Sequence, residues 1–338
     1  MKKLEGLQWL RAIAALAVVA FHVEITMAKQ KYFGLPTFPL ANVGFSGVHL
    51  FFVLSGFVIF WAHRGDLGRS EVVPEYFWKR IRRLIPPLWV LLLPLLIAWW
   101  AHPAGVGGKG FSGGDFVSAF LVFPAPANEV LDVEWTLRHE VVFYLFFSLL
   151  ILNLRLGILA LVVWFVLCFV PFSNLPPQLS IVLAEVNVLF LLGAVTYFVA
   201  QRFGLRARGG VVFLTAVLWC LAIFYAFVTG ANVHGRSSIY IFGPPSALAV
   251  FCAVTHEFSF DGWFSGVMGK IGDASYAIYL IHFPVISILC KLAIRFDSLM
   301  PREVWFFAIF LFSVLAGQIF HVVAERPLVR WLSKYNLR

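Results

Sequence analysis

Long apolar runs recur along the whole of this 338-residue chain, and they constrain its fold more than any other feature. A helix needs ~17–25 apolar residues to cross a bilayer. We predict ten such helices, at residues 6–28, 45–63, 84–101, 135–152, 155–172, 179–200, 210–228, 238–255, 273–293 and 303–323. The predicted fold class is therefore all-α: a polytopic membrane protein with about ten transmembrane helices.

The composition agrees with this class. Hydrophobic residues make up 61% of the chain and charged residues only 13%, whereas soluble domains average ~25% charged residues. We therefore expect one transmembrane domain over residues 1–338 and no separate soluble domain. The net charge of +9 does not indicate nucleic-acid binding, because Lys and Arg in membrane proteins mainly mark the cytoplasmic face. The cysteines have no metal-binding spacing, so no metal site is predicted.

The positive charges also predict the orientation. With the amino terminus in the cytoplasm, 17 of the 26 Lys and Arg residues fall on the cytoplasmic side and 7 on the outer side. This bias predicts that both termini are cytoplasmic. The first run has no small-residue cleavage site, so we expect an uncleaved first helix. The apolar segment 116–127 is short and contains Pro124 and Pro126, which favours a re-entrant or interfacial piece.

Arg11 and His22 are ionisable residues that lie inside the first run. Such groups are costly in a membrane and are functional hypotheses by default. Eleven helical steps leave the two side chains about 20° apart around the axis and ~16 Å apart along it. On the predicted topology Arg11 lies near the cytoplasmic end and His22 near the outer end. This arrangement suits a long, narrow substrate with an anionic end and a reactive end.

The fourth run opens with Arg138, His139 and Glu140. These residues could form a self-neutralising ion pair, or Glu140, the deepest, could be a functional carboxylate. On the predicted topology Glu140 and His22 share a depth, and a carboxylate beside an imidazole can hold its tautomer. A contact between them is a hypothesis.

A basic cluster, Lys79 to Arg83, comes directly before the third run. It could bind lipid headgroups at the cytoplasmic face. Alternatively, Arg80 and Arg83 lie side by side at i and i+3, where two guanidinium groups could grip phosphate oxygens.

Two further runs carry polar residues. Ser55 and Gly56 in the second run are typical of close helix packing. His282 falls mid-membrane in the ninth run, where a lone histidine often bonds a backbone carbonyl. Tyr276 and Tyr279 could satisfy it locally.

Together these blocks resemble the acyltransferase-3 family of membrane O-acyltransferases, from about Leu4 to Pro327. The resemblance rests on the Arg11-to-His22 spacing, the blocks 47–57, 135–144 and 275–282, Arg80 and Arg83 before a proline, and Glu325-x-Pro327. It implies that His22 is catalytic with Arg11 as its companion, and that Arg80, Arg83 and Glu140 are functional. We predict His22 and Glu140 as catalytic residues. The predicted acyl-CoA-binding residues are Arg11, Arg80, Arg83, Ser55, Tyr276 and His282. The chain departs from the family pattern at His49, Trp89 and Arg138.

The resemblance implies transfer of an acyl group, acetyl by preference, from cytoplasmic acyl-CoA to a hydroxyl of a glycan or glycolipid at the outer side of a bacterial inner membrane. Acyl-CoA is then a co-substrate, no cofactor is bound permanently, and the partners are the carbohydrate acceptor and membrane lipids. His22 could deprotonate the acceptor or carry the acyl group itself. The alternatives are a glycan or lipid transporter or flippase whose buried charges line a pathway, and an inactive relative that acts as a membrane partner.

Overall fold

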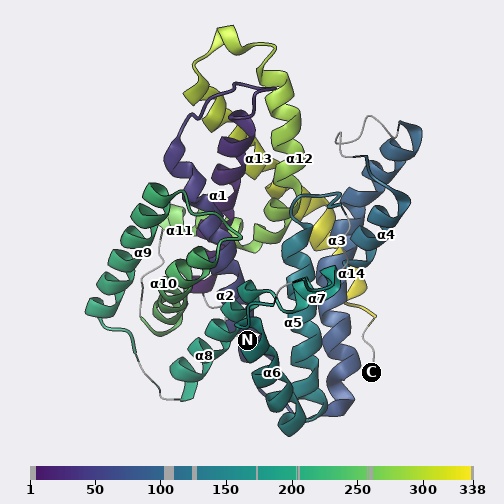
Figure 1. The fold of residues 1–338 in the computed structure, drawn as a ribbon, viewed down its shortest axis with the longest axis vertical. Helices are drawn as coiled ribbons and strands as arrows, with labels where there is room; N and C mark the ends of the chain where they lie inside the picture. Colours follow the sequence, from purple (N-terminus) through teal and green to yellow (C-terminus); the bar gives the residue numbers. More distant parts are fainter. Residues whose placement is uncertain are drawn as a thin grey trace. The chain divides into compact units, whose positions relative to one another are not determined.

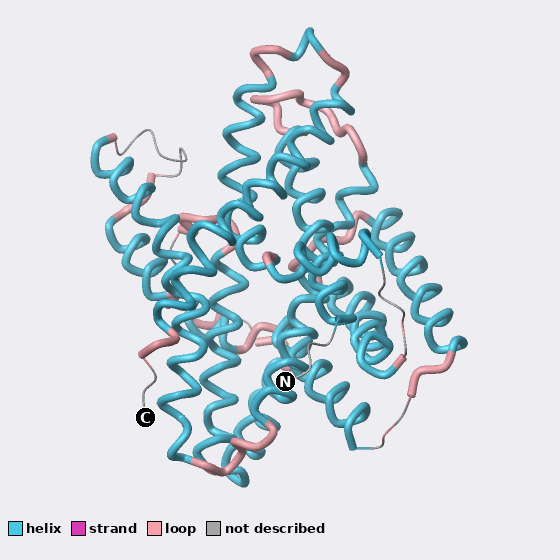
Figure 2. Tube along the Cα trace, turned by 180° about the vertical axis from the view of Figure 1, so that it is seen from behind, coloured by secondary structure: helices cyan, strands magenta, loops and turns pink. Residues whose placement is uncertain are grey.

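A computed structural model describes residues 5–102, 110–123, 128–172, 174–202, 204, 206–256, 258 and 262–335 of the chain. Within these ranges the regular structure is entirely helical, as Figure 1 and Figure 2 show, and no strand occurs. The all-α prediction is therefore confirmed. Pro124 and Pro126, which motivated the re-entrant prediction, lie outside the described residues.

Nine helical segments in the described ranges are long and apolar enough to cross a membrane. They are Glu5–Met27, Pro39–His63, Ser70–Ala101, Glu134–Leu152, Gln178–Gln201, Gly209–Thr229, Arg236–Thr255, Ser275–Ala293 and Arg302–Leu332. This confirms a polytopic membrane protein. The tenth predicted run, 155–172, corresponds to a shorter helix, α6 (Leu154–Cys168, 15 residues). It ends at its C-cap Phe169, and Pro171 two residues later cannot continue a helix. Which side the termini face stays a prediction.

The chain forms two compact units, and unit 1 contains Met1–Ala62 and Val188–Gln318. Its described helices are α1 (Glu5–Met27), η1 (Pro39–Phe45), α2 (Ser46–His63), α8 (Val188–Arg202), α9 (Gly209–Thr229), α10 (Arg236–Thr255), α11 (Gly262–Asp273), α12 (Ser275–Ala293), η4 (Asp297–Leu299) and α13 (Arg302–Phe320).

Helix α1 is at the centre of the contacts in unit 1, because it packs against η1, α10, α11 and α12. Figure 1 shows α1 and α12 side by side. One buried cluster joins Val23 and Met27 of α1 to Ile278 and Ile286 of α12 and to Phe306 of α13. Lipid tails are as apolar as these side chains, so the packing is stabilised by close van der Waals contact. The α1–α12 interface positions most of the predicted site in this unit.

Glycines bring the backbone of α2 close to two neighbours in unit 1. A Cβ atom on Gly47 would meet the carbonyl oxygen of Ala14 in α1. On the same helix, a Cβ on Gly56 would meet the carbonyl oxygen of Phe190 in α8. Small residues allow such close approach of membrane helices. The packing predicted for the Ser55–Gly56 region is therefore confirmed at Gly56.

Unit 2 contains His63–Asn187 and Ile319–Arg338. Its described elements are η2 (Ser70–Val72), α3 (Val73–Ala101), α4 (Gly113–Leu121), α5 (Glu134–Leu152), α6, α7 (Pro177–Val182), η3 (Glu185–Asn187), the π-helical turn η5 (His321–Glu325) and α14 (Arg326–Leu332).

In unit 2, α3 contacts α4, α5 and α14, while α5 packs along α6. The ring of Phe146 on α5 stacks on Trp164 of α6, with centroids 4.1 Å apart. Helix α3 begins at Val73, so the predicted basic cluster lies within a helix rather than before one. Arg80 and Arg83 are therefore held on a regular scaffold.

Helix α4 begins with a capping box, in which Ser112 and Asp115 bond each other's backbone N–H groups. The Asp115 carboxylate also accepts a bond from the Asn128 amide, at 2.8 Å. Burial opposes ionisation of Asp115, but the hydrogen bonds from Ser112 and Asn128 outweigh it and lower the pKa of its carboxyl. The ionised Asp115 therefore connects Ser112, at the start of α4, to the backbone of Asn128.

Candidate active site

Arg11 and His22 both bond side chains of α12. Nε of Arg11 donates to Oγ of Ser275 at 3.1 Å. Nδ1 of His22 lies 3.1 Å from Nε2 of His282. The predicted common face of α1 is thus confirmed, and it is the face that packs against α12.

The contacts of His22 determine where its proton lies. Nδ1 is also 3.0 Å from the carbonyl oxygen of Val18, one turn earlier on α1. A carbonyl oxygen can only accept, so Nδ1 carries the hydrogen. In the neutral ring the lone pair is then on Nε2, which is the nitrogen that can act as a base.

The other predicted residues of unit 1 differ in their surroundings. His282 is completely buried, and its Nδ1 lies 3.0 Å from the Ile278 carbonyl, as expected for a membrane histidine. Its position beside His22 favours a role through that residue over direct contact with acyl-CoA. Tyr276 is buried one residue after Ser275, and Ser55 is half-buried on α2.

Glu24 is a charged residue of the first run that the sequence analysis did not single out. It is 1% exposed. Its two carboxylate oxygens accept bonds from the backbone N–H groups of Thr37 and Phe38, each at 2.9 Å. Glu24 therefore holds the loop that follows α1 against the end of that helix.

Arg80 lies at the centre of a second polar cluster, in unit 2. One of its terminal nitrogens donates to Nε2 of His63 at 2.7 Å. Nδ1 of His63 in turn donates to Oδ2 of Asp66, also at 2.7 Å. His63 can accept from Arg80 only as the neutral Nδ1–H tautomer, which the Asp66 carboxylate favours. The Asp66–His63 pair thus orients the guanidinium group.

Aromatic rings surround the same guanidinium. Its carbon lies 5.8 Å from the ring centroid of Tyr76 and 5.7 Å from that of Tyr144. Arg83 is one turn further along α3 and within electrostatic reach of Tyr144. In the described part of the chain, Nε of Arg80 is buried without a hydrogen-bond partner. A buried donor of this kind is costly unless a ligand satisfies it.

The three consecutive ionisable residues of α5 bond three different groups. A terminal nitrogen of Arg138 donates to Glu134 at 3.3 Å. His139 bonds the side chain of Asn187 at 2.9 Å. Glu140 accepts a bond from the hydroxyl of Tyr144. Arg138 thus pairs with Glu134, one turn earlier on α5, while the internal ion pair of Arg138, His139 and Glu140 stays a hypothesis.

The predicted site residues fall in two sets. Arg11, His22, Ser55, Tyr276 and His282 belong to unit 1, whereas Arg80, Arg83 and Glu140 belong to unit 2. The hypothetical contact between Glu140 and His22 stays a prediction. Sequence reasoning missed His63 and Asp66, although their i, i+3 spacing at a helix end was a usable signal.

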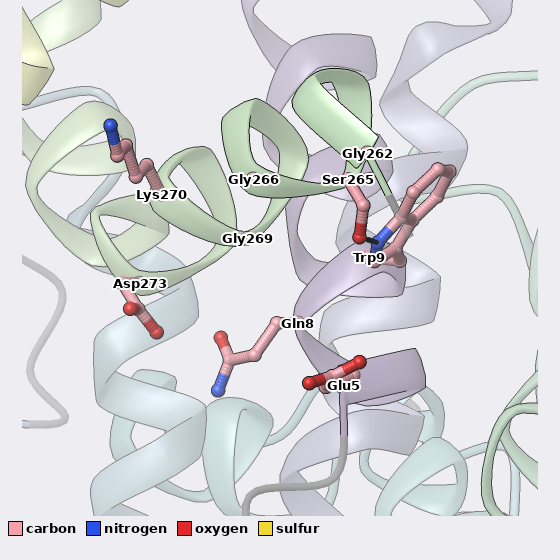
Figure 3. A pocket seen from close by; sticks show the side chains of 9 residues that line it. All are labelled: Glu5, Gln8, Trp9, Gly262, Ser265, Gly266, Gly269, Lys270 and Asp273. Atoms are coloured by element: carbon pink, nitrogen blue, oxygen red, sulfur yellow. Dashed lines mark hydrogen bonds between the residues drawn. The ribbon is translucent and has the colours of Figure 1, made fainter. Parts of the chain in front are cut away.

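A cavity of about 400 Å³ lies in unit 1, between the start of α1 and α11. Figure 3 shows the side chains that line it. Trp9 crosses one end, where its Nε1 donates to Oγ of Ser265 at 3.3 Å. The charged groups in its lining are Glu5, Lys270 and Asp273. Two carboxylates against one ammonium group make this cavity a poor match for a polyphosphate. Among the described residues, no group of three or more His, Cys, Asp or Glu is placed to hold a metal ion.

Comparison with known proteins gives one family. The acyltransferase-domain model of the acyltransferase-3 family matches residues 4–322. The chain is 28% identical to the acyltransferase MdmB of Streptomyces mycarofaciens, over 99% of this chain and 93% of MdmB. It is 27% identical to the exopolysaccharide production protein ExoZ of Rhizobium meliloti, over 86% of this chain and 90% of ExoZ.

A further relative is the peptidoglycan O-acetyltransferase OatA of Listeria monocytogenes, 24% identical over 85% of this chain. The chain spans about half the length of OatA, of which 50% is covered. No solved structure matches the chain.

Proposed function

Since the chain belongs to the acyltransferase-3 family, we propose that this membrane O-acyltransferase moves an acetyl group from acetyl-CoA to a hydroxyl of a glycan or glycolipid. The donor is cytoplasmic and the acceptor is at the outer side of a bacterial inner membrane. The relatives named for a polysaccharide, OatA and ExoZ, support this class of acceptor.

The observation that carries the proposal is the protonation of His22. Its Nδ1–H donates to the Val18 carbonyl at 3.0 Å, so the lone pair is on Nε2. A neutral imidazole is the usual general base for a hydroxyl nucleophile, and it takes the proton at the nitrogen that carries the lone pair. His22 is only partly buried, so its ring is not sealed within the packed core.

The reaction then follows in two steps. Nε2 of His22 takes the proton as the acceptor's O–H bond breaks, and the oxygen bonds to the carbonyl carbon of the thioester. When the tetrahedral intermediate collapses, the C–S bond breaks and the CoA thiolate leaves. The thiolate receives the proton from Nε2, which restores the neutral ring.

The cluster around Arg80 supports the CoA part of the proposal. CoA carries phosphate groups, and guanidinium groups bind phosphate oxygens with paired, charge-assisted hydrogen bonds. His63 orients Arg80 from one side at 2.7 Å, while Nε of Arg80 is buried and is available to a ligand oxygen. Arg83, one turn along α3, supplies a second positive charge.

The test is release of CoA thiol from acetyl-CoA by purified protein, with and without a membrane glycan extract. Wild-type protein should release thiol faster with the extract. We expect His22→Ala to lower the rate about 10²–10⁴-fold, the usual contribution of a general base. The matched control is His102→Ala, because His102 is exposed at the end of α3.

Normal turnover by His22→Ala would disprove the proposed role of His22. If well-folded wild-type protein releases no thiol with acetyl-, succinyl- or longer acyl-CoA, the acyl-CoA proposal itself is wrong and transport becomes the better explanation.

A further inference from the structure

His282 is the most completely enclosed polar side chain near His22. It has no exposed surface, and both of its ring nitrogens lie within hydrogen-bond distance of defined partners. Nδ1 is 3.0 Å from the Ile278 carbonyl oxygen, and Nε2 is 3.1 Å from Nδ1 of His22. The two rings are tilted by 60°, with centroids 4.8 Å apart.

These partners assign the protons of both rings. The Ile278 carbonyl can only accept, so Nδ1 of His282 carries a hydrogen. A charged ring without exposed surface is costly, so His282 is neutral and its Nε2 is an acceptor. The Nδ1–H of His22 therefore points at two acceptors, the Val18 carbonyl and Nε2 of His282.

From this arrangement we infer that His282 is a positioning residue for His22. It accepts the Nδ1–H bond of His22, holds the plane of that ring, and stabilises the positive charge that appears when Nε2 takes the acceptor's proton. The inference rests on the proposed role of His22 as the base.

The Val18 carbonyl alone does not provide the same control. It belongs to the helix that carries His22 and moves with it, so it selects the tautomer but leaves the ring plane less constrained. His282 comes from α12 and fixes the ring from outside α1. Phe283, also on α12, meets the His22 ring edge to face, with centroids 5.6 Å apart. Helix α12 thus supplies both a polar contact and an apolar wall.

His22 becomes positively charged during turnover, so the hydrogen bond to His282 should stabilise the reacting ring more than the apolar contact with Phe283 does. A hydrogen bond to a charged group is roughly twice as strong as one between neutral groups. The contact therefore stabilises the transition state more than the ground state, which is the condition for an effect on kcat. Binding of acetyl-CoA should depend on it little.

The experiment compares three substitutions of His282 in the full-length purified protein. His282→Gln keeps an acceptor oxygen near the position of Nε2. His282→Asn has the same amide one methylene shorter, so its oxygen does not reach His22. His282→Met keeps similar volume without a comparable acceptor. The packing control is Cys290→Ala, a buried position two turns further along α12.

We expect His282→Met and His282→Asn to lower kcat about 10- to 100-fold, as loss of outer partners of a reactive histidine does in metal sites, with KM for acetyl-CoA within about twofold. The fall in log kcat caused by His282→Gln should be smaller by at least a third than the fall caused by His282→Met. Cys290→Ala should keep kcat within about twofold of the wild-type value. If His282→Met does not fold, the comparison of Gln with Asn carries the test.

Equal kcat for the Gln and Asn variants would overturn the inference, because packing alone would then explain the loss. Unchanged kcat in His282→Met would overturn it as well. Failure of the proposed function would give a different result. In that case wild-type protein would release no thiol, or His22→Ala would turn over normally, whatever the His282 variants do.

Discussion

At the scale of single residues, each reactive side chain of the candidate site is fixed by a second polar group. His282 and Val18 fix His22, and the Asp66–His63 pair fixes Arg80. Buried polar groups of this kind stabilise one geometry because an unpartnered alternative is costly. We therefore expect the supporting residues to affect the proposed activity as well as the groups they hold.

Loss of His63 should weaken donor binding. Without it, Arg80 loses its orienting acceptor at 2.7 Å, and a hydrogen bond to a charged group contributes ~1.5–3 kcal/mol. We expect His63→Leu to raise KM for acetyl-CoA about 10-fold with a smaller effect on kcat. The measurement is KM and kcat by steady-state kinetics. The control donor is S-acetyl-pantetheine, which lacks the nucleotide phosphates.

An equal rise in KM for both donors would contradict the phosphate role of Arg80. Asp66→Asn should have a milder effect than His63→Leu, since an amide oxygen can still accept from Nδ1 of His63.

The sequence predicted which side chains share one helix face, but it did not predict which helices these side chains contact. Arg11 and His22 share a face because helical periodicity dictates it. Their partners Ser275 and His282 lie 264 and 260 residues away, and no local pattern specifies which helices pack together. His63 and Asp66 were missed for a related reason. Their proposed role is to orient Arg80, which lies 17 residues beyond His63 in the chain.

At the scale of elements, the crossing of α2 and α8 depends on backbone contact. Gly56 faces the Phe190 carbonyl, and Gly193 of α8 faces the Val53 carbonyl. A side chain at either position would have to push two helices apart, and overpacking of this kind costs typically ~1–3 kcal/mol.

Gly56→Val should therefore lower the thermal stability of the purified protein by several degrees, as measured by loss of the monodisperse peak after heating. Gly210→Ala on α9 is the matched control, because a Cβ there meets nothing within 4 Å. A Gly56→Val protein as stable as the control would show that the crossing can relax.

The length of the tenth predicted helix was wrong. The predicted run 155–172 counted apolar residues beyond the helix, whereas α6 stops at Cys168. Hydropathy alone does not register that Pro171 blocks helix continuation. The nine longer segments were all predicted, although Ser70–Ala101 begins well before its predicted run at residue 84 and Arg302–Leu332 ends beyond residue 323.

At the scale of the whole molecule, the direction of α12 bears on how often the chain crosses the membrane. Arg11 meets Ser275 and His22 meets His282, so α1 and α12 run in the same direction. Parallel helices need an odd number of crossings between them. The described ranges contain six longer segments between α1 and α12, an even number. We therefore predict that α6, the shorter apolar helix among them, also crosses the membrane.

This predicts ten crossings with both termini on one side. In a Cys220→Ala background, which removes the exposed cysteine, Asn174→Cys after α6 should react with a membrane-impermeant maleimide in intact cells. Arg155→Cys, at the start of α6, should react only after permeabilisation. Reaction of both from the same side would mean that α6 does not cross.

The two polar bonds between α1 and α12 also limit how the protein can move during turnover. They join Arg11 to Ser275 and His22 to His282, at separate levels along the interface. Sliding one helix past the other by a single residue, about 1.5 Å, would stretch both bonds at once. We therefore expect the two helices to keep their register and move together, and we expect any opening that admits or releases substrate to involve other helices.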